Sequence, residues 1–453
     1  MTMTPQSPTG HPATRSRDER SPDIRADVAV IGGGIIGHGI AWEARQSGRS
    51  VVIIDDAPGT GASWAAAGML APVSELHYQE EDLLELMLHS SWLWPAFAAG
   101  LESAGASREP GAGGSGTGYL TTSTLAVGAD AADRRALADL RGVQQSSGLT
   151  VEPLTVREAR AREPLLSPGI SCAFEIPADH QVDPRKLLAV ISDSLPGSVV
   201  RERAAGLLRE DGRVIGVSLA GGGTVHAGET VIANGLESAS LGGLPSGLQL
   251  PLRPVYGDIL RLRVPAYLQP LVTSTVRGMV HGVPVYIVPR QDGTVVIGAT
   301  QREDALSGAG TEAAATGPAG TATPAGSAVS AGGVYQLLRD AQVLVPAVAE
   351  LELLEATARA RPGTPDNAPL LGRVADAATG RDVGGLIIAT GFFRHGVLLT
   401  PAAASICRQL MDGDADPRWA PFRPDRFSRP AATPATRATT AHTVTIDPNK
   451  ETA

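Results

Sequence analysis

Aromatic residues are scarce in this sequence, because Phe, Trp and Tyr together make up 4% of its 453 residues. Cysteine is nearly absent, with only Cys172 and Cys407, which lie far apart. Two distant cysteines form no zinc spacing and give little reason for a disulfide, so we expect two buried free thiols and no metal site. Basic residues are not in excess either. The formal net charge of -9 argues against a nucleic-acid partner.

Long hydrophobic runs are also missing. The first 25 residues contain no apolar core of a signal peptide, and no stretch approaches the roughly 20 apolar residues that span a bilayer. We therefore expect no membrane partner and a cytoplasmic location. Hydrophobic residues still make up 43% of the chain, enough for a core, and 453 residues suffice for two domains or one large two-lobed unit.

Four segments have too few large apolar side chains to fold. We expect disordered tails over residues 1–25 and 428–453, and flexible loops over residues 105–118 and 308–333. Regular elements are predicted between these segments by periodicity and turn signals. They are a helix over 83–101, a helix capped by Asp183 with Pro184 at its start, a hairpin and strand over 217–235, antiparallel strands over 252–265 and 284–300 with a turn at Asp292-Gly293, and a buried strand over 385–391.

A nucleotide-binding pattern occupies residues 27–56, DVAVIGGGIIGHGIAWEARQSGRSVVIIDD. The pattern G-x-G-x-x-G falls on Gly32, Gly34 and Gly37, between an apolar strand and a helix. These glycines permit a tight turn, close approach to a diphosphate and close packing of helix on strand. The diphosphate then lies at the N-terminus of the helix, where free N–H groups favour an anion. Asp55 follows the second strand and is placed to bind a ribose diol.

The motif alone does not separate NAD from FAD, but three features favour FAD. No second G-x-G-x-x-G is present, so one dinucleotide is expected. Residues 61–72, GASWAAAGMLAP, are small and permit a flat ring system to approach the backbone. Residues 389–401, ATGFFRHGVLLTP, place a second strand-to-glycine junction late in the chain. An early and a late segment that meet on one ligand suit a long cofactor such as FAD.

These stretches resemble the D-amino-acid-oxidase superfamily of flavoproteins, and within it the glycine oxidases of thiamine biosynthesis. The supporting motifs run in family order over residues 26–416: GGGIIG, GASWAAAGMLAP, QVDPR, RPVYGDILRLR, VYIVPR, GAT, RPGTPDNAPLLG and ATGFFRHGVLLTP. The resemblance implies an FAD enzyme that oxidises glycine and other small amines to an imine. The imine hydrolyses to glyoxylate and ammonia, and O2 is reduced to hydrogen peroxide. It also implies a homo-oligomer.

The expected fold class is α/β (α+β, two domains). A Rossmann-like FAD-binding domain is assembled from discontinuous segments, and a substrate domain is built on an antiparallel sheet. The FAD-binding domain is predicted over residues 26–95, 166–245 and 356–427. The substrate domain is predicted over residues 96–165 and 246–355, with the flexible insertion 308–333 inside it.

The resemblance also implies the site residues. Arg361 matches the arginine that binds the substrate carboxylate, and a planar guanidinium suits that task. Tyr286 matches a substrate-site tyrosine, and Arg394 matches the position whose backbone approaches the amine. Beyond Gly32, Gly34, Gly37 and Asp55, the implied FAD contacts are Ala62, Ser63, Ala67, Gly68, Met69, Ala205, Gly391, His395, Gly396, Val397 and Leu398.

Several positions depart from the family pattern. Arg359 stands where a glycine is usual, Phe392 where a histidine is common, and Glu237 where an aromatic residue is usual. Val280-His281 replace a second tyrosine. These departures leave the prediction of FAD unchanged but put the turnover rate and the preference for glycine in doubt. Three alternatives to a glycine oxidase stay open. They are an oxidase or dehydrogenase of sarcosine or a small D-amino acid, an inactive FAD-binding homologue, and an NAD-dependent dehydrogenase, the last disfavoured by the single nucleotide motif.

Overall fold

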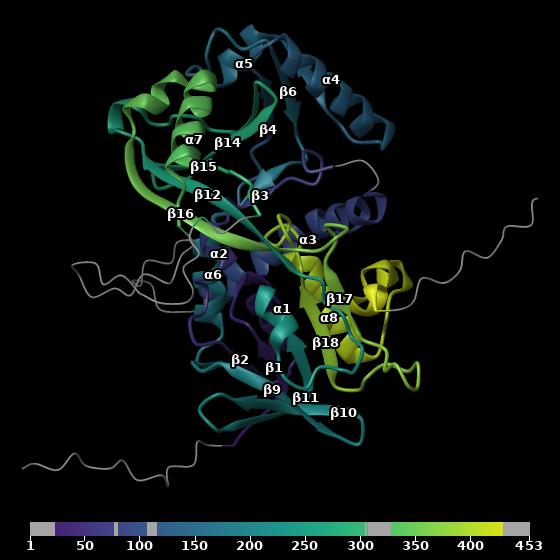
Figure 1. The fold of residues 1–453 in the computed structure, drawn as a ribbon. Coiled ribbons are helices and arrows are strands. Elements are labelled where there is room, and N and C mark those ends of the chain that lie inside the picture. Colours follow the sequence, from purple (N-terminus) through teal and green to yellow (C-terminus); the bar gives the residue numbers. More distant parts are fainter. Residues whose placement is uncertain (1–22, 77–79, 107–115, 304–305, 307–327, 429–453) are drawn as a thin grey trace, which may run out of the picture.

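The computed structural model describes residues 23–76, 80–106, 116–303, 306 and 328–428. Two lobes lie one above the other in Figure 1, each built on an eight-stranded sheet. Most of the predicted tails and flexible loops lie outside the described residues. Three of their boundaries are corrected. The loop predicted from residue 105 begins later, because the helix Glu81–Ala106 extends to Ala106. The first strand begins at Ile24, where it pairs with Val225. A helix begins at Ala331, because the Ser330 hydroxyl accepts the Gly333 N–H and caps it.

The lower lobe in Figure 1 contains the nucleotide motif. Its sheet has the order β17-β18-β11-β1-β2-β8, with β9 and β10 joined to β11. The strands are β1 (Ile24–Ile31), β2 (Val51–Ile54), β8 (Val199–Val200), β9 (Ala204–Glu210), β10 (Arg213–Leu219), β11 (Thr224–Ile232), β17 (Leu370–Gly372) and β18 (Leu386–Thr390). β1 lies parallel to β2 and β11, and β11 lies parallel to β18. This is the parallel sheet that the motif predicts.

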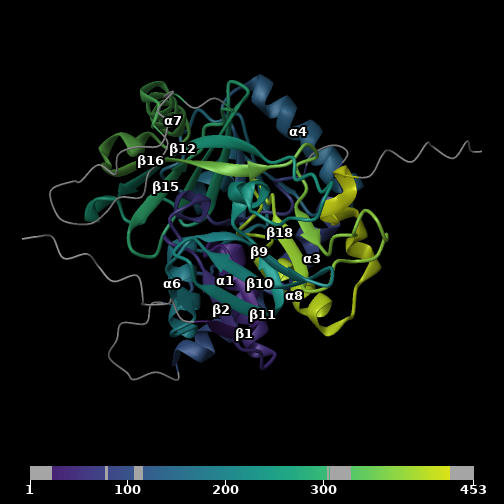
Figure 2. The ribbon, with the colours of Figure 1, turned by 60° about the horizontal axis from the view of Figure 1, so that its bottom comes forward.

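Two hydrophobic layers cover this sheet, and the alternation of β1 assigns a side chain to each. Val28 and Val30 pack into a core shared with four helices, whereas Ala29 and Ile31 face a core shared with the β9–β10 hairpin. The helices are α1 (Ile35–Gln46), α3 (Glu81–Ala106), α6 (Pro184–Ser194) and α8 (Thr400–Asp412). They gather around the sheet in the view of Figure 2.

The upper lobe contains a mostly antiparallel sheet of order β16-β12-β15-β14-β13-β4-β6-β5. Its strands are β4 (Thr124–Gly128), β5 (Glu152–Leu154), β6 (Cys172–Ile176), β12 (Arg253–Arg263), β13 (Thr275–Val280), β14 (Val283–Pro289), β15 (Thr294–Gly298) and β16 (Glu352–Gly363). The helices of this lobe are α4 (Ala131–Ser146), α5 (Val156–Arg162) and α7 (Ala331–Leu344). α7 packs into a core of Leu, Ile and Val side chains from this sheet. The α/β class with an antiparallel second sheet is thus confirmed.

The local predictions also agree with the structure. The helix expected over 83–101 is the central part of α3, and Asp183 caps α6 by accepting the Arg185 and Lys186 N–H groups. Cys172 and Cys407 are both buried and free. Among the described residues, no helix is long and apolar enough to cross a membrane. One predicted domain boundary differs from the structure. The segment from residue 166 is predicted to belong to the FAD-binding domain, but β6, which lies in it, pairs with β4 and β5 in the upper sheet.

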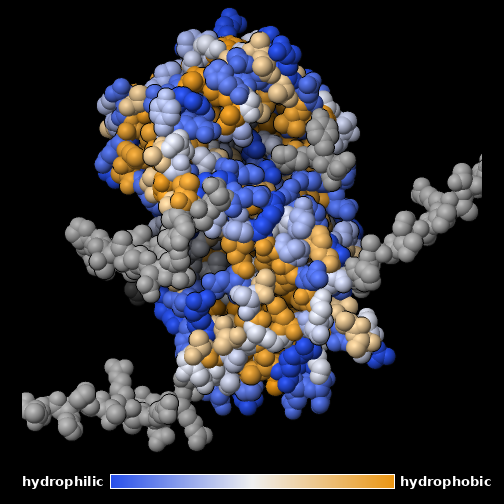
Figure 3. All heavy atoms as spheres, viewed as in Figure 1, coloured by the Kyte–Doolittle hydropathy of each residue, from blue (hydrophilic) through white to orange (hydrophobic). Residues whose placement is uncertain are grey.

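Strands β12 and β16 connect the lobes. They pair antiparallel along their whole length, from Arg253 opposite Gly363 to Arg263 opposite Glu352. In Figure 1, β16 runs from the upper lobe down towards the lower one. On the face drawn in Figure 3, hydrophilic residues gather in the band between the lobes. Since Arg361 lies near the end of β16, this pairing brings it to the junction.

A buried carboxylate holds the loop after β3 (Met69–Leu70). Asp179 precedes β7 (His180–Gln181), the partner of β3, and its side chain accepts the N–H groups of Val73 (2.9 Å) and Ser74 (3.0 Å). The Ser74 hydroxyl donates to it as well. Burial raises the pKa of Asp179 to about 6, although these hydrogen bonds oppose the shift.

We expect Asp179→Ala to lower the free energy of unfolding by about 2–4 kcal/mol, because it leaves two buried N–H groups without an acceptor. Urea denaturation of the holoprotein at pH 7 measures the loss. Asp292→Ala is the matched control, because Asp292 accepts the Thr294 N–H in an exposed turn, and we expect a loss below about 1 kcal/mol. Equal losses in the two variants would contradict the anchoring role.

The raised pKa of Asp179 also predicts how the free energy of unfolding changes with pH. A carboxyl whose folded pKa lies above its usual value of 3.8 contributes most stability when protonated. Its contribution is complete below pH 3.8 and is lost as the pH rises to about 6. The wild-type protein is therefore expected to lose this contribution across that window, and Asp179→Asn removes that part of the pH dependence.

Candidate cofactor and substrate site

A cavity of about 530 Å³ lies where the two sheets meet. Its walls come from the β1–α1 turn, from the segment around α2 (Ala62–Ala65), from the loop after β11, from strands of the upper sheet and from the loop after β18. The segments that sequence analysis singled out as early and late cofactor contacts are therefore brought together. One end of the cavity is the nucleotide turn, and the other is lined by charged side chains.

The glycine turn has the close contacts that a Rossmann turn requires. Gly32 has a φ of +106°, and a Cβ there would lie 2.6 Å from the Ala233 backbone. A Cβ on Gly37 would lie 1.9 Å from the carbonyl oxygen of Gly32, so this glycine permits α1 to pack on β1. Gly34 precedes α1 and lines the cavity; it has no side chain to cap the helix, and the Ser63 hydroxyl accepts only the first N–H group, that of Ile35, at 3.0 Å. The start of α1 therefore fits an anionic diphosphate.

Asp55 lies on the cavity wall just after β2. Its carboxylate accepts the Gly33 N–H at 2.5 Å and the Ala57 N–H at 2.8 Å. Each carboxylate oxygen has a second lone pair, so Asp55 can still accept a hydrogen bond from a ribose hydroxyl. These two hydrogen bonds also fix the carboxylate beside the glycine turn, as the motif predicts.

The remaining predicted cofactor contacts are almost all on the cavity wall. Those that line it are Ala62, Ser63, Ala67, Gly68, Met69, Gly391, His395, Gly396, Val397 and Leu398. Gly68 has a φ of +75°, and a Cβ there would lie 2.0 Å from the Val182 carbonyl oxygen. A larger residue at this position would therefore clash with backbone, which explains the small side chains of this segment.

Two predicted contacts lie off the wall. Gly37 packs against Gly32 instead of facing the cavity. Ala205 is also outside it, because its carbonyl oxygen accepts the Gly242 N–H at 3.3 Å, while the preceding residues Arg203 and Ala204 line the cavity. Glu237 stands at the same end and pairs with Arg203 at 2.9 Å, which accounts for a charged residue there.

The three predicted substrate residues line the opposite end of the cavity. The Arg361 guanidinium lies over Gly257, where a Cβ would be 2.3 Å from Nη1. The Tyr286 hydroxyl lies over Gly298, where a Cβ would be 2.4 Å away. Two glycines in the strands of the upper sheet therefore make room for the two side chains. Within the described ranges, no acceptor and no carboxylate is bound to the Arg361 guanidinium.

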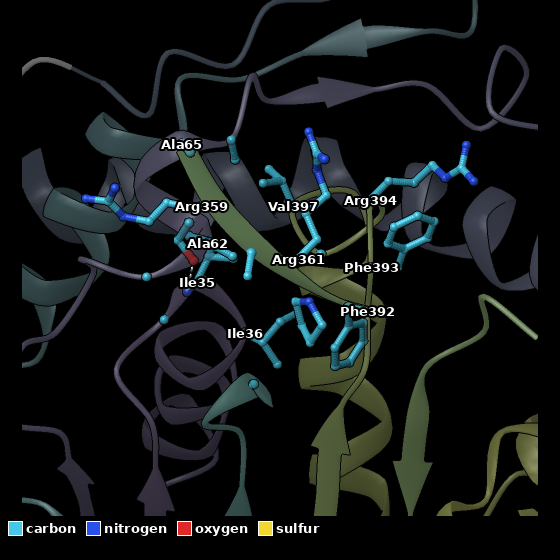
Figure 4. A pocket seen from close by; sticks show the side chains of 18 of the residues that line it. Ile35, Ile36, Ala62, Ala65, Arg359, Arg361, Phe392, Phe393, Arg394 and Val397 are labelled. Atoms are coloured by element: carbon cyan, nitrogen blue, oxygen red, sulfur yellow. Dashed lines mark hydrogen bonds between the residues drawn. The ribbon is translucent and has the colours of Figure 1, made fainter. Parts of the chain in front are cut away.

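Arg359 does not compete with Arg361. Its Nε donates to the Thr60 carbonyl at 3.0 Å, and its Nη1 donates to Thr357 Oγ1 and to the Ala358 carbonyl. Figure 4 shows its side chain pointing away from Arg361, on the other side of β16 from Arg394. The charged residue at a position usually held by glycine is thus bound to backbone and leaves the Arg361 site undistorted.

Sequence analysis missed two charged residues at this end, Glu75 and Arg277. Arg277 Nη1 contacts Glu75 Oε1, and Arg394 Nη1 lies 3.6 Å from Glu75 Oε2. Burial alone would raise the pKa of Glu75, but the positive charges of Arg277, His395 and Arg394 bring it down to about 2. Glu75 belongs to no motif, and Arg277 is one polar residue in a strand. Only the ion pair between them, which joins residues far apart in the sequence, identifies them as part of the site.

The comparisons with known proteins agree with this cavity. Residues 27–410 match the family described as FAD dependent oxidoreductase. The chain belongs to the FAD-dependent oxidoreductase family. It is 33% identical over 396 residues to a glycine oxidase of Geobacillus kaustophilus, covering 86% of this chain and 93% of that protein. The crystal structure of glycine oxidase from that organism matches with a TM-score of 0.73 and 29% identity, over 89% of this chain and 99% of the other.

A second kind of relative is longer. The bifunctional protein ThiO/ThiG of Trichormus variabilis is 29% identical over 413 residues, which is 90% of this chain but only 56% of that protein. The chain therefore spans little more than half of this relative. The family confirms FAD as the cofactor and a glycine-oxidase-like oxidoreductase as the class of enzyme. The expectation of FAD over NAD is thus confirmed.

Proposed function

We propose that this protein oxidises glycine, and other small amines less well, to the imine. The imine hydrolyses to glyoxylate and ammonia, while O2 is reduced to hydrogen peroxide. The observation that supports this function best is the Arg361 guanidinium, which lines the cavity beside Tyr286 and has no bound carboxylate from the described chain. An arginine on a cavity wall whose guanidinium has no bound acceptor is suited to bidentate binding of a substrate carboxylate.

The residues of the site position the substrate. FAD, when bound, supplies the acceptor for the hydride that leaves the substrate Cα. Arg361 would bind the carboxylate, and Tyr286 with the backbone carbonyl of Arg394 would orient the amine. Fixing the carboxylate and the nitrogen removes the rotational freedom of a small substrate, which lowers the barrier. No separate base is required when the amine enters in its neutral form.

The names of the relatives suggest the pathway in which the reaction takes place. Both a glycine oxidase and a bifunctional ThiO/ThiG protein are similar to this chain. We therefore place the reaction in the thiazole branch of thiamine biosynthesis, where the imine is the useful product. We also propose a cytoplasmic homo-oligomer that acts on a small soluble substrate and O2.

The decisive experiment is anaerobic mixing of the purified holoprotein with glycine while flavin absorbance is followed near about 450 nm, a band set by the cofactor. We expect the band to bleach, and to return with release of hydrogen peroxide when air is admitted. Sarcosine and D-alanine are mixed in parallel. Bleaching by one of these but not by glycine would assign the alternative substrate. No bleaching by any of the three would favour an inactive FAD-binding homologue.

A further inference from the structure

Glu75 presents an acceptor atom that no described group uses. Its Oε2 is buried and accepts no hydrogen bond within the described part of the chain. Arg394 Nη1 lies 3.6 Å from it, beyond hydrogen-bond distance. The other oxygen, Oε1, is occupied by Arg277. Because buried acceptors are nearly always satisfied, an unpaired Oε2 on a residue that lines the cavity points to a donor on the ligand.

The charges on either side of Tyr286 indicate which part of the ligand this donor belongs to. Burial raises the pKa of the Tyr286 hydroxyl, Arg361 opposes that shift, and the charge of Glu75 adds to it. The hydroxyl is therefore close to a cation and to an anion at once. An α-amino acid has the complementary arrangement, with a carboxylate at one end and N–H donors at the other. With the carboxylate on Arg361, the nitrogen faces Glu75.

We propose that Oε2 of Glu75 accepts a hydrogen bond from the amino group of the substrate, which makes Glu75 the residue that distinguishes amino acids from carboxylates without N–H. Arg277 and Arg394 flank the two oxygens and partly neutralise the carboxylate. Glu75 therefore binds an N–H group without strongly favouring the ammonium form, which cannot lose a hydride. This assignment rests on the proposed function and names a further contact of that same site.

The test compares two ligands on the holoenzyme. Glycine and acetate share the carboxylate, but acetate has no amine. Each is titrated anaerobically into wild type and Glu75→Gln, and its Kd is taken from the perturbation or bleaching of the flavin spectrum. We expect Glu75→Gln to raise the Kd of glycine by about 10-fold or more, because an amide N–H then faces the substrate N–H. The Kd of acetate is expected to change less than about threefold.

Glu80→Gln is the matched control. Glu80 also has a buried Oε2 without a described partner, and its Oε1 accepts the Asn367 amide at 3.0 Å, but it does not line the cavity. Both Kd values should stay at wild-type levels in this variant. If Glu75→Gln does not fold, Glu75→Asp provides the same comparison, because it keeps the charge but withdraws the acceptor from the substrate. A glycine-specific loss is again expected.

The outcomes separate the two proposals. Equal changes for glycine and acetate in the Glu75 variants, or no change for either, would overturn the contact and leave Glu75 as a support for Arg277 and Arg394. Bleaching of wild type by glycine tests the oxidase function independently. Since ligand binding perturbs oxidised flavin, the glycine-to-acetate ratio is measurable even when glycine is not oxidised. If the wild-type flavin spectrum does not respond to glycine at all, both the proposed oxidation of glycine and the proposed Glu75 contact are contradicted.

Discussion

Arg361→Gln is expected to lower kcat/KM for glycine by about 100- to 1,000-fold. The substitution removes a bidentate, charge-assisted pair with the substrate carboxylate inside the cavity, and losing such a pair costs about 3–4 kcal/mol. Each 1.4 kcal/mol corresponds to about tenfold. FAD content should not change, because Arg361 lies at the end of the cavity opposite the glycine turn. Steady-state peroxide production and the flavin spectrum of the purified variant provide the two measurements.

Arg359→Gln is the control for this variant. It removes the same charge from the same strand two residues away, but Arg359 is bound to the carbonyls of Thr60 and Ala358 and points away from Arg361. We expect kcat/KM within about fivefold of wild type, as for substitutions outside the substrate contacts. If Arg359→Gln loses as much activity as Arg361→Gln, the net charge of the cavity and not the carboxylate clamp determines turnover.

Gly37→Ala is expected to weaken FAD binding by about 10- to 100-fold. The added Cβ would lie 1.9 Å from the Gly32 carbonyl oxygen and 3.3 Å from a Val30 methyl group. Both are held by β1 in the centre of the sheet, so α1 must move away from β1. Forced separation of packed elements costs about 1–3 kcal/mol, and it also displaces the N–H groups that face the diphosphate. Titration of the apoprotein with FAD, followed by flavin fluorescence, gives the Kd.

Gly100→Ala serves as the comparison. Gly100 lies inside α3, and a Cβ there would meet nothing within 4 Å. Alanine favours a helix over glycine by about 1 kcal/mol, so this variant should fold at least as well as wild type and bind FAD with the same Kd. Wild-type FAD affinity in Gly37→Ala would show that α1 can shift without loss of the diphosphate site.

The sequence predicts the cofactor half of the site well because its information is local. Gly32, Gly34, Gly37 and Asp55 lie within one strand–helix–strand unit, so the order of residues alone places them together. The segments around Met69 and Val397 are less local, and the resemblance to a flavoprotein family assigns them. The structure then shows why small residues are required, since Gly68 lies against the Val182 carbonyl.

The substrate half is less predictable, because contacts distant in sequence determine it. Glu75 comes from the loop after β3 and Arg277 from β13, 202 residues later, and nothing near either residue indicates the pair. The orientation of Arg359 depends on a hydrogen bond to the Thr60 carbonyl, and the pattern of residues in the sequence does not predict that contact. Strand β6 is a further example. Its own sequence does not indicate to which sheet it belongs, and only its pairing with β4, a strand distant in sequence, places it in the upper lobe.

The central place of β1 in its sheet has a consequence for synthesis. β1 lies between β2, which follows it closely, and β11, which in turn pairs with β18 near the end of the chain. At roughly 5–20 residues per second, β18 leaves the ribosome tens of seconds after β1. Before β8 and β11 are made, the apolar strands β1 and β2 of the nucleotide motif have only each other as neighbours in the sheet. A chain released before β18 lacks the wall that contains Gly391 and Leu398, so the newly made protein acquires its FAD pocket only after β18 and the loop that follows it have been made.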